Sequence, residues 1–234
     1  MIQASIRYLA VFVLVLTPLN IVPSPSFGEG VSQGNNIEKT RVLAAAGHAE
    51  AQYLLGEMLT NGRGVPEDRH EAARWLRKSA EKGYAPAQYM LGYLWAYGGG
   101  GILPNDKPAD IKPRFWFRKA AQQGHAGAQR ELGKEYLYLP PENPFAAADW
   151  LRKAAERGDG EAQMLLGALY VVGQGVTVNL IHAYKWASLA QKHLTTDAAL
   201  RKQAADLLRN ASTQLTPEQL QAAKSLVRQW KPAR

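Results

Sequence analysis

The sequence predicts an all-α protein: an α/α superhelical solenoid of about four helix–turn–helix repeats, with an N-terminal half-repeat and C-terminal capping helices. The pair Ala-Gln occurs four times in register, and Leu-Gly follows each pair at the same offset. One tryptophan follows in every unit, and glycines spaced 34 to 41 residues apart open the units. Self-similarity at such a period is the signature of stacked helical repeats. The tryptophans are Trp75, Trp116, Trp150 and Trp186, and the opening glycines are Gly47, Gly83, Gly124 and Gly158.

The composition is that of a folded chain without covalent cross-links. Of 234 residues, 46% are hydrophobic and none is cysteine, and 28 Lys+Arg against 20 Asp+Glu give a net charge of +8. This apolar fraction excludes an intrinsically disordered chain. The lack of cysteine excludes disulfides, thiolate metal sites and a cysteine nucleophile.

The first residues are typical of an export signal. Arg7 precedes an apolar run that Thr17, Pro18 and Asn20 interrupt, and small residues follow. This pattern predicts a signal peptide over residues 1–28, cleaved after Ser26 or Gly28. The alternative is an uncleaved inner-membrane anchor over residues 8–22. Both place the rest of the chain outside the cytoplasm, and we expect the periplasm. Residues 29–36 are expected to form a flexible linker.

In the first repeat, apolar residues recur with the period of an α-helix. Ala51, Leu55 and Met58 fall on one face. This pattern predicts a helix over residues 49–61. Gly62 predicts its end, because glycine readily adopts the left-handed conformation found after helices.

The second helix of this repeat is predicted to begin at Asp68, a suitable N-cap. Ala72, Trp75 and Ser79 form one stripe along it. The small residues Gly56 and Ala72 would let the two helices approach closely. The tryptophan would then fill the gap between neighbouring repeats, because one helix pair cannot bury its apolar stripe alone.

The second and third repeats depart from the glycine-rich turn of the first. The second repeat has a longer loop, and Pro113 is expected in the first turn of its second helix. In the third repeat Asn143 is a candidate N-cap, and Pro144 would take the first helical position.

The array is predicted to extend over residues 37–194. Residues 37–46 resemble the second half of a repeat and would cover the first one. Residues 195–234 are expected to form two capping helices, the second opened by a capping box between Thr216 and Gln219.

The pattern Gly-x-x-x-Ala-Gln-x-x-Leu-Gly, then Gly-x-Gly-Val, then Ala-x-x-Trp-x-x-Lys-Ala resembles the Sel-one-like repeats, which are relatives of the tetratricopeptide repeats. The segment 47–80 matches almost throughout, with Ser79 where alanine is usual. The resemblance implies a solenoid that serves as a protein-interaction scaffold. Similar exported bacterial proteins look like envelope regulators or assembly factors, and cysteine-rich relatives differ from this chain.

No residue pattern assigns a catalytic, cofactor-binding or metal-binding site. Ser79 and Lys82 match a Ser-x-x-Lys motif, but the accompanying Ser-Asp-Asn and Lys-Thr-Gly motifs do not occur. We therefore expect Ser79 to pack, and the protein not to be an enzyme. A cell-envelope hydrolase or lactam-binding enzyme on the same helices is the alternative.

A basic pair follows three of the tryptophans at the same offset. These pairs are Arg77-Lys78, Arg118-Lys119 and Arg152-Lys153. A solvated outer face explains them. The alternative is a surface for cell-wall glycan or another anionic envelope polymer. Nucleic acid is not expected as a partner in an exported compartment.

The face of each first helix opposite its core stripe is predicted to line the inner surface of the solenoid. Such surfaces bind partners in repeat proteins, and aromatic residues and arginine are the usual anchors. The predicted contacts to a peptide or protein segment are Tyr53, Glu57, Tyr89, Tyr93, Arg130 and Lys134. The alternative is that the tyrosines only pack between neighbouring repeats.

Overall fold

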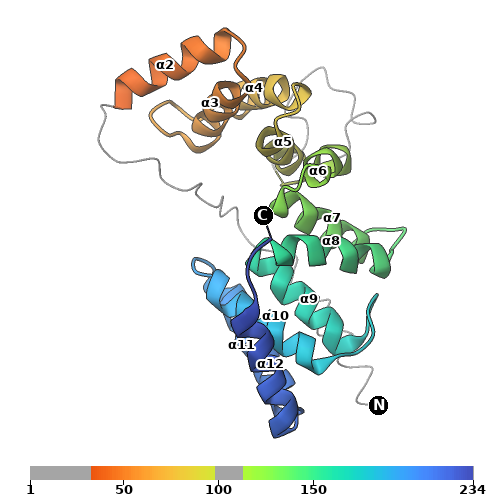
Figure 1. The fold of residues 1–234 in the computed structure, drawn as a ribbon. Coiled ribbons are helices and arrows are strands. Elements are labelled where there is room, and N and C mark those ends of the chain that lie inside the picture. The colour runs from red at the N-terminus through yellow and green to blue at the C-terminus, as the bar shows by residue number, and fades with distance from the viewer. Residues whose placement is uncertain (1–32, 98–112, 234) are drawn as a thin grey trace. The chain divides into compact units, whose positions relative to one another are not determined.

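A computed structural model describes residues 33–97 and 113–233, and all of its regular elements there are α-helices (Figure 1). The all-α prediction is confirmed. The signal peptide or anchor predicted over residues 1–28 lies outside the described residues. The helices are α2 (Gln33–Ala45), α3 (Ala49–Asn61), α4 (Arg69–Glu81), α5 (Ala85–Tyr97), α6 (Pro113–Gln122), α7 (Ala126–Tyr138), α8 (Pro144–Glu156), α9 (Gly160–Val172), α10 (Leu180–His193), α11 (Ala198–Thr213) and α12 (Pro217–Gln229).

The chain forms two compact units. Helices α2 to α6 make up one and helices α7 to α12 the other. Within each unit, consecutive helices pack against one another, so that α4 lies between α3 and α5, and α9 lies between α8 and α10. This stepwise packing is that of a repeat solenoid, in which each hairpin is buried by its neighbours. None of the described helices has the length and apolar character needed to cross a bilayer.

The helix boundaries follow local chemistry. Gly62 ends α3 with φ 64°, and the Asp68 carboxylate accepts a hydrogen bond from the Glu71 backbone N–H at the start of α4. Asn143 caps α8 in the same way, and Pro144 is its first residue. Helix α2 begins at Gln33, so it extends into the predicted linker 29–36.

Each helix pair closes over the glycine of its Leu-Gly motif. A Cβ on Gly56 would lie 2.6 Å from Leu76 Cγ, and one on Gly133 would lie 2.6 Å from Leu151 Cγ. The predicted close approach is confirmed. In both helix pairs the residue that approaches the glycine directly follows the tryptophan. These residues, Leu76 and Leu151, are fully buried. The stripe predicted for α4 did not include Leu76.

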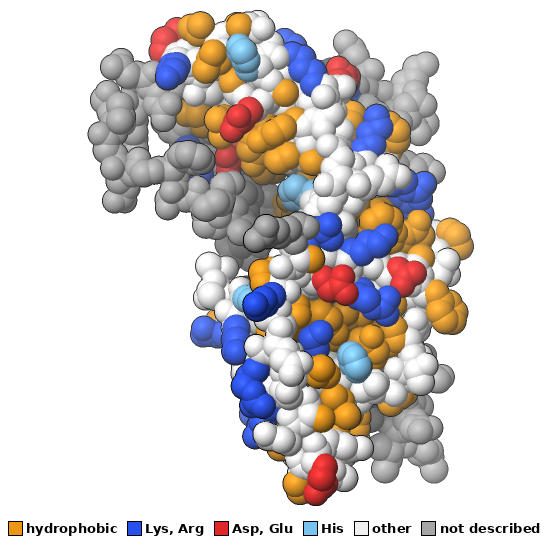
Figure 2. Space-filling model, viewed as in Figure 1, with side chains coloured by type: hydrophobic (Ala, Val, Ile, Leu, Met, Phe, Trp, Pro, Cys, Tyr) orange, Lys and Arg blue, Asp and Glu red, His pale blue; other side chains and the backbone are white. Residues whose placement is uncertain are grey.

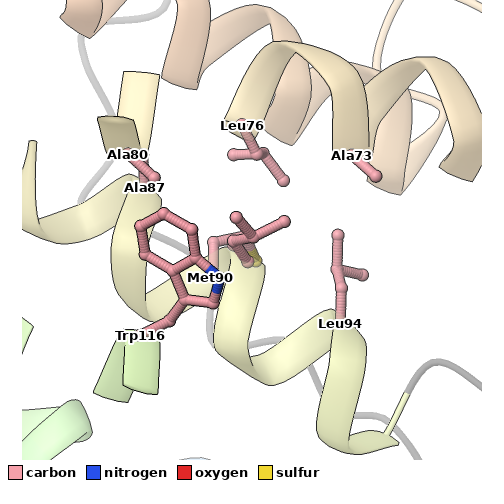
Figure 3. Close-up of a cluster of buried hydrophobic side chains, with 8 residues drawn as sticks. Ala73, Leu76, Ala80, Ala87, Met90, Leu94 and Trp116 are labelled. Carbon is pink, nitrogen blue, oxygen red and sulfur yellow. The ribbon is translucent and has the colours of Figure 1, made fainter. Parts of the chain in front are cut away.

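Two of the tryptophans pack at boundaries of the repeats, where the prediction placed them. Trp116 from α6 joins Leu76 of α4 and Met90 and Leu94 of α5 in one buried cluster (Figure 3). Trp75 packs against the cluster that α2, α3 and α4 share. The tryptophan of each of these two repeats therefore seals the boundary with the preceding element.

The glutamine of the Ala-Gln pair ties each repeat to the one before it. The amide groups of Gln52, Gln88 and Gln163 donate hydrogen bonds to backbone carbonyls eight residues earlier, at 2.9–3.0 Å. These carbonyls lie near the end of the preceding helix, where each also accepts a hydrogen bond from the backbone N–H of an opening glycine, Gly47, Gly83 or Gly158. The recurrence of glutamine therefore has a structural cause.

The two C-terminal helices are confirmed, including the capping box between Thr216 and Gln219. Helix α12 packs against α10. Trp230 follows it, with its ring 5.2 Å from that of His193, and the Ala233 backbone N–H donates to the Glu156 carbonyl at 2.7 Å. Residues 230–233 thus return to the end of α8.

Candidate functional site

The first helices of neighbouring repeats are connected at one repeated position. The residue six after the opening glycine contacts the residue that directly follows the next opening glycine. In the unit α2–α6 these are Tyr53 and Tyr84, whose ring centroids are 5.5 Å apart. In the unit α7–α12 they are Arg130 and Asp159, whose Nη1 and Oδ2 atoms are 2.8 Å apart. Contact between two tyrosine rings in one unit and an ion pair in the other therefore join adjacent repeats at the same repeat position.

Arg130 is the centre of a largely buried cluster of charges. Its guanidinium contacts Glu131 at 2.9 Å and Glu161 at 3.2 Å, besides Asp159. Lys134 adds contacts to Glu131 at 3.5 Å and to Glu161 at 3.1 Å. Figure 2 shows acidic and basic side chains side by side over α7 and α9. We call these five residues the charge cluster.

The charge cluster holds three carboxylates against two cations in a poorly solvated place. The side chains of Glu131 and Arg130 are 2% and 14% exposed. Burial disfavours the charged form of Lys134, but Glu131 and Glu161 outweigh this and raise its pKa above the ordinary value. Arg130 and Lys134 are therefore held by intramolecular ion pairs, and neither is presented as an isolated cation to a partner.

Asp159 serves two purposes. Its Oδ1 atom caps α9 by accepting a hydrogen bond from the Ala162 backbone N–H at 2.8 Å, while Oδ2 binds Arg130. Burial raises the pKa of its carboxyl group, although Arg130 and the capping bond act in the opposite direction. The start of α9 is thus coupled to the preceding repeat.

His125 is the matching N-cap one repeat earlier. Its Nδ1 atom accepts a hydrogen bond from the Ala128 backbone N–H at 3.2 Å, which requires a neutral ring with an unprotonated Nδ1. Burial, with a smaller contribution from Arg130, lowers the pKa of His125 from 6.5 to about 4. The folded protein therefore holds this imidazole neutral over a range where the unfolded chain binds a proton.

We expect the His125 cap to make the protein acid-sensitive. As pH falls from 6.5 to about 4, the unfolded state gains a proton at His125 that the folded state does not, so stability falls. His125→Asn keeps a capping side chain that does not titrate. Urea midpoints measured at neutral pH and near pH 4 should therefore decline less in the variant. An equal decline in both proteins would contradict this role of His125.

Tyrosines line one face of α5 on successive turns. The ring centroids of Tyr89 and Tyr93 are 6.0 Å apart, and those of Tyr93 and Tyr97 are 4.7 Å apart. Tyr89 also contacts the ring of Phe117 at 6.0 Å. Tyr97 is 46% exposed. We call Tyr53, Tyr84, Tyr89, Tyr93 and Tyr97 the tyrosine face.

The structure corrects the predicted surroundings of Glu57. We expected an open surface at this residue, but it is only 6% exposed. The loop after α3 turns back along the helix and brings Arg63 to 3.8 Å from the carboxylate. Helical periodicity could not predict this, because it does not say which helix faces a loop will cover.

The basic pairs after the tryptophans have partners within the fold. Lys78 and Lys153 lie 4.3 Å from the ring centroids of Trp75 and Trp150. Arg152 Nη1 donates a hydrogen bond to Asp149 Oδ1 at 2.9 Å. These residues form intramolecular contacts that a purely solvated face would not require.

Ser79 is fully buried, and its hydroxyl donates a hydrogen bond to the Ala49 carbonyl at 2.6 Å. The bond joins α4 to the start of α3, which is the packing role expected for this residue.

Sequence reasoning missed several members of both clusters. Tyr97 lies four residues after Tyr93, so helical periodicity could have included it. Asp159 shares its repeat position with Tyr84 and His125, and three such different residue types at one position give no pattern that predicts an ion pair. Glu131 and Glu161 carried no separate signal, because only the fold brings their side chains together.

Comparison with known proteins agrees with this architecture. The Sel1 repeat family model matches residues 49–84, 85–125, 126–159 and 160–190. A protective antigen of uropathogenic Escherichia coli strains, described as displaying an SLR fold, has a similar structure, with a TM-score of 0.71 and 33% identity over 83% of this chain and 40% of that chain. A Sel1 repeat protein from Oxalobacter formigenes has a TM-score of 0.64 and 29% identity over 76% of this chain and 49% of that chain. The chain therefore spans less than half of either relative. Comparison with curated proteins gave no match.

Proposed function

Because the chain belongs to the Sel1 repeat family, we propose that it is an exported, periplasmic scaffold that binds a protein partner and does not act as an enzyme. The tyrosine face is the proposed contact surface. Repeat solenoids present the surface of their first helices to partners. Tyrosine is enriched among the residues that dominate binding energy.

The observation that carries this proposal is the grouping of five tyrosines on two neighbouring repeats. Tyr53 and Tyr84 are in contact, and Tyr89, Tyr93 and Tyr97 follow one helix face. A tyrosine side chain offers a large contact area at a small cost in conformational entropy. Arg130 and Lys134 are not part of the proposed surface, because the charge cluster holds them.

The alternatives of a hydrolase or a glycan binder gain no support from these contacts. The Ser79 hydroxyl is hydrogen-bonded to a backbone carbonyl of α3. The lysines that follow the tryptophans lie over the indole rings. A protein-binding scaffold remains the function that the geometry favours.

The experiment is site-specific photo-crosslinking in the native host. A photoreactive phenylalanine derivative replaces Tyr93 or, as a matched control on the second helix of the preceding repeat, the exposed Arg74. We expect a defined protein adduct in the periplasmic fraction from position 93 and not from position 74. Equal adducts from both positions, or none from position 93, would contradict the proposal.

A further inference from the structure

The unit α2–α6 is electrically polarised between its first and second helices. Helix α3 carries two glutamates and no Lys or Arg, and helix α5 carries no charged residue. Helix α4 carries four Lys/Arg against two Glu, and helix α6 carries three Lys/Arg and no acidic residue. Glu57 is buried beside Arg63, so the exposed acidic charge next to the tyrosine face is that of Glu50.

An acidic side chain borders the tyrosines directly. Glu50 lies in the first turn of α3 and is exposed. Its charge acts on Tyr84, where burial and then Glu50 raise the pKa of the phenol. Figure 2 shows hydrophobic side chains over α3 and α5 with acidic side chains beside them. Glu50 thus makes the Tyr84 end of the tyrosine face favour cations over anions.

Tyrosine rings attract cations through their faces, and an Arg or Lys positioned over a ring gains about 0.5–1 kcal/mol at exposed sites. The same chemistry already operates within this chain, where Lys78 lies 4.3 Å from the Trp75 ring centroid. A basic segment would be repelled by the rest of a protein with a net charge of +8. Like-charge repulsion elsewhere would therefore direct such a segment to this surface.

The spacing of the rings also indicates the shape of the segment. The centroids of Tyr89, Tyr93 and Tyr97 are 6.0 and 4.7 Å apart along α5. Alternate side chains of an extended chain are about 6.6 Å apart on one side. The first ring spacing is close to this repeat and the second is about 2 Å shorter, a difference that the long side chains of Arg and Lys can span.

We propose that the tyrosine face binds an extended peptide segment of the partner that carries Arg or Lys at alternate positions. This inference rests on the proposed function and names the chemistry of the partner. Tyr89, Tyr93 and Tyr97 receive the cationic side chains, and Glu50 supplies an ion pair at the edge of the surface.

The test uses two fluorescent peptides of equal length, with arginine or glutamate at every second position among serines. Fluorescence anisotropy with the purified protein should show saturable binding of the arginine peptide. Replacing each of Tyr89, Tyr93 and Tyr97 with leucine should weaken this binding about two- to fivefold per ring. Phenylalanine at the same positions should preserve it, because the ring face remains. Circular dichroism verifies that each variant keeps its helices.

Two further variants separate the tyrosine face from general charge effects. Glu50→Gln should weaken binding of the arginine peptide and reduce its dependence on salt. Arg74→Gln, on the basic helix α4, should not weaken it. The inference is overturned if the arginine peptide does not bind, if leucine and phenylalanine variants bind it equally, or if the glutamate peptide competes for the same surface. If any of these results is found while position 93 still crosslinks a protein partner, the proposed function stands and only the basic-segment inference fails. If position 93 gives no crosslink, the proposed function and this inference both fail.

Discussion

Replacing Arg130 with methionine is expected to lower the free energy of unfolding by about 3–5 kcal/mol, because it leaves buried carboxylates without their main cation. Lys134 would remain beside Glu131 and Glu161, and Asp159 would lose its ion pair with Arg130. Methionine keeps most of the apolar volume of the arginine side chain. The loss of stability therefore measures the effect of removing the charge rather than the effect of lost packing. Urea unfolding followed by helical circular dichroism measures it.

A matched control is Arg209→Met. Arg209 forms an ion pair with Asp206 at 3.4 Å, but its side chain is 76% exposed. Such a pair contributes about 0–1 kcal/mol. Adding Asp159→Asn to Arg130→Met should restore part of the lost stability, because it removes one unpaired carboxylate and keeps a capping side chain. Equal losses from Arg130→Met and Arg209→Met would refute the buried charge cluster.

Replacing Gly133 with alanine is expected to destabilise the protein by about 1–3 kcal/mol. On an open helix the same change stabilises by about 0.8–1 kcal/mol, because alanine favours the helix. Here the new Cβ would lie 2.6 Å from Leu151 Cγ and 3.3 Å from the Ala147 carbonyl oxygen. Helices α7 and α8 would have to move apart, and the urea midpoint should fall.

Two companion variants test this explanation. At Gly167 the nearest atom to an added Cβ is the Leu207 Cδ2 methyl at 3.1 Å, which can move more easily, so Gly167→Ala should cost less. Leu151→Ala opens space next to Gly133. The double variant Gly133→Ala/Leu151→Ala should therefore lose less stability than the two single losses together. Simple additivity would show that the two side chains do not compete for space.

The helix boundaries could be predicted closely because residues within a few positions of each end determine them. Gly62, Asp68, Asn143 and Pro144 each act on the backbone within a few positions, and every one of them has the predicted role. Helix α2 extends beyond its prediction, because no repeat motif marks its first residues. The recurring motif also identified the close helix approach, because a glycine that recurs at one helix position indicates that a neighbouring helix passes close to it.

The candidate site was less accessible to prediction. A helical wheel places Tyr53 and Glu57 on one face, but it cannot show that the ring of Tyr84 contacts Tyr53 or that Arg63 lies beside Glu57. Arg130 looked like a binding residue for the same reason. Its ion-pair partners come from the next repeat and from its own helix. Only the folded structure shows that these carboxylates already pair with the guanidinium of Arg130.

Residues 230–233 pack back against the end of α8, and this contact determines where further repeats could be inserted into the array. Trp230 lies beside the Gly158 turn, with its Cη2 atom 3.8 Å from where a Cβ on that glycine would be, and Ala233 uses the Glu156 carbonyl. A copy of a repeat grafted directly after α10 would meet this tail and have to dislodge it. Duplication of residues 126–159 ahead of α9 keeps the closing segment on its own helices, so engineered elongation belongs upstream of α9.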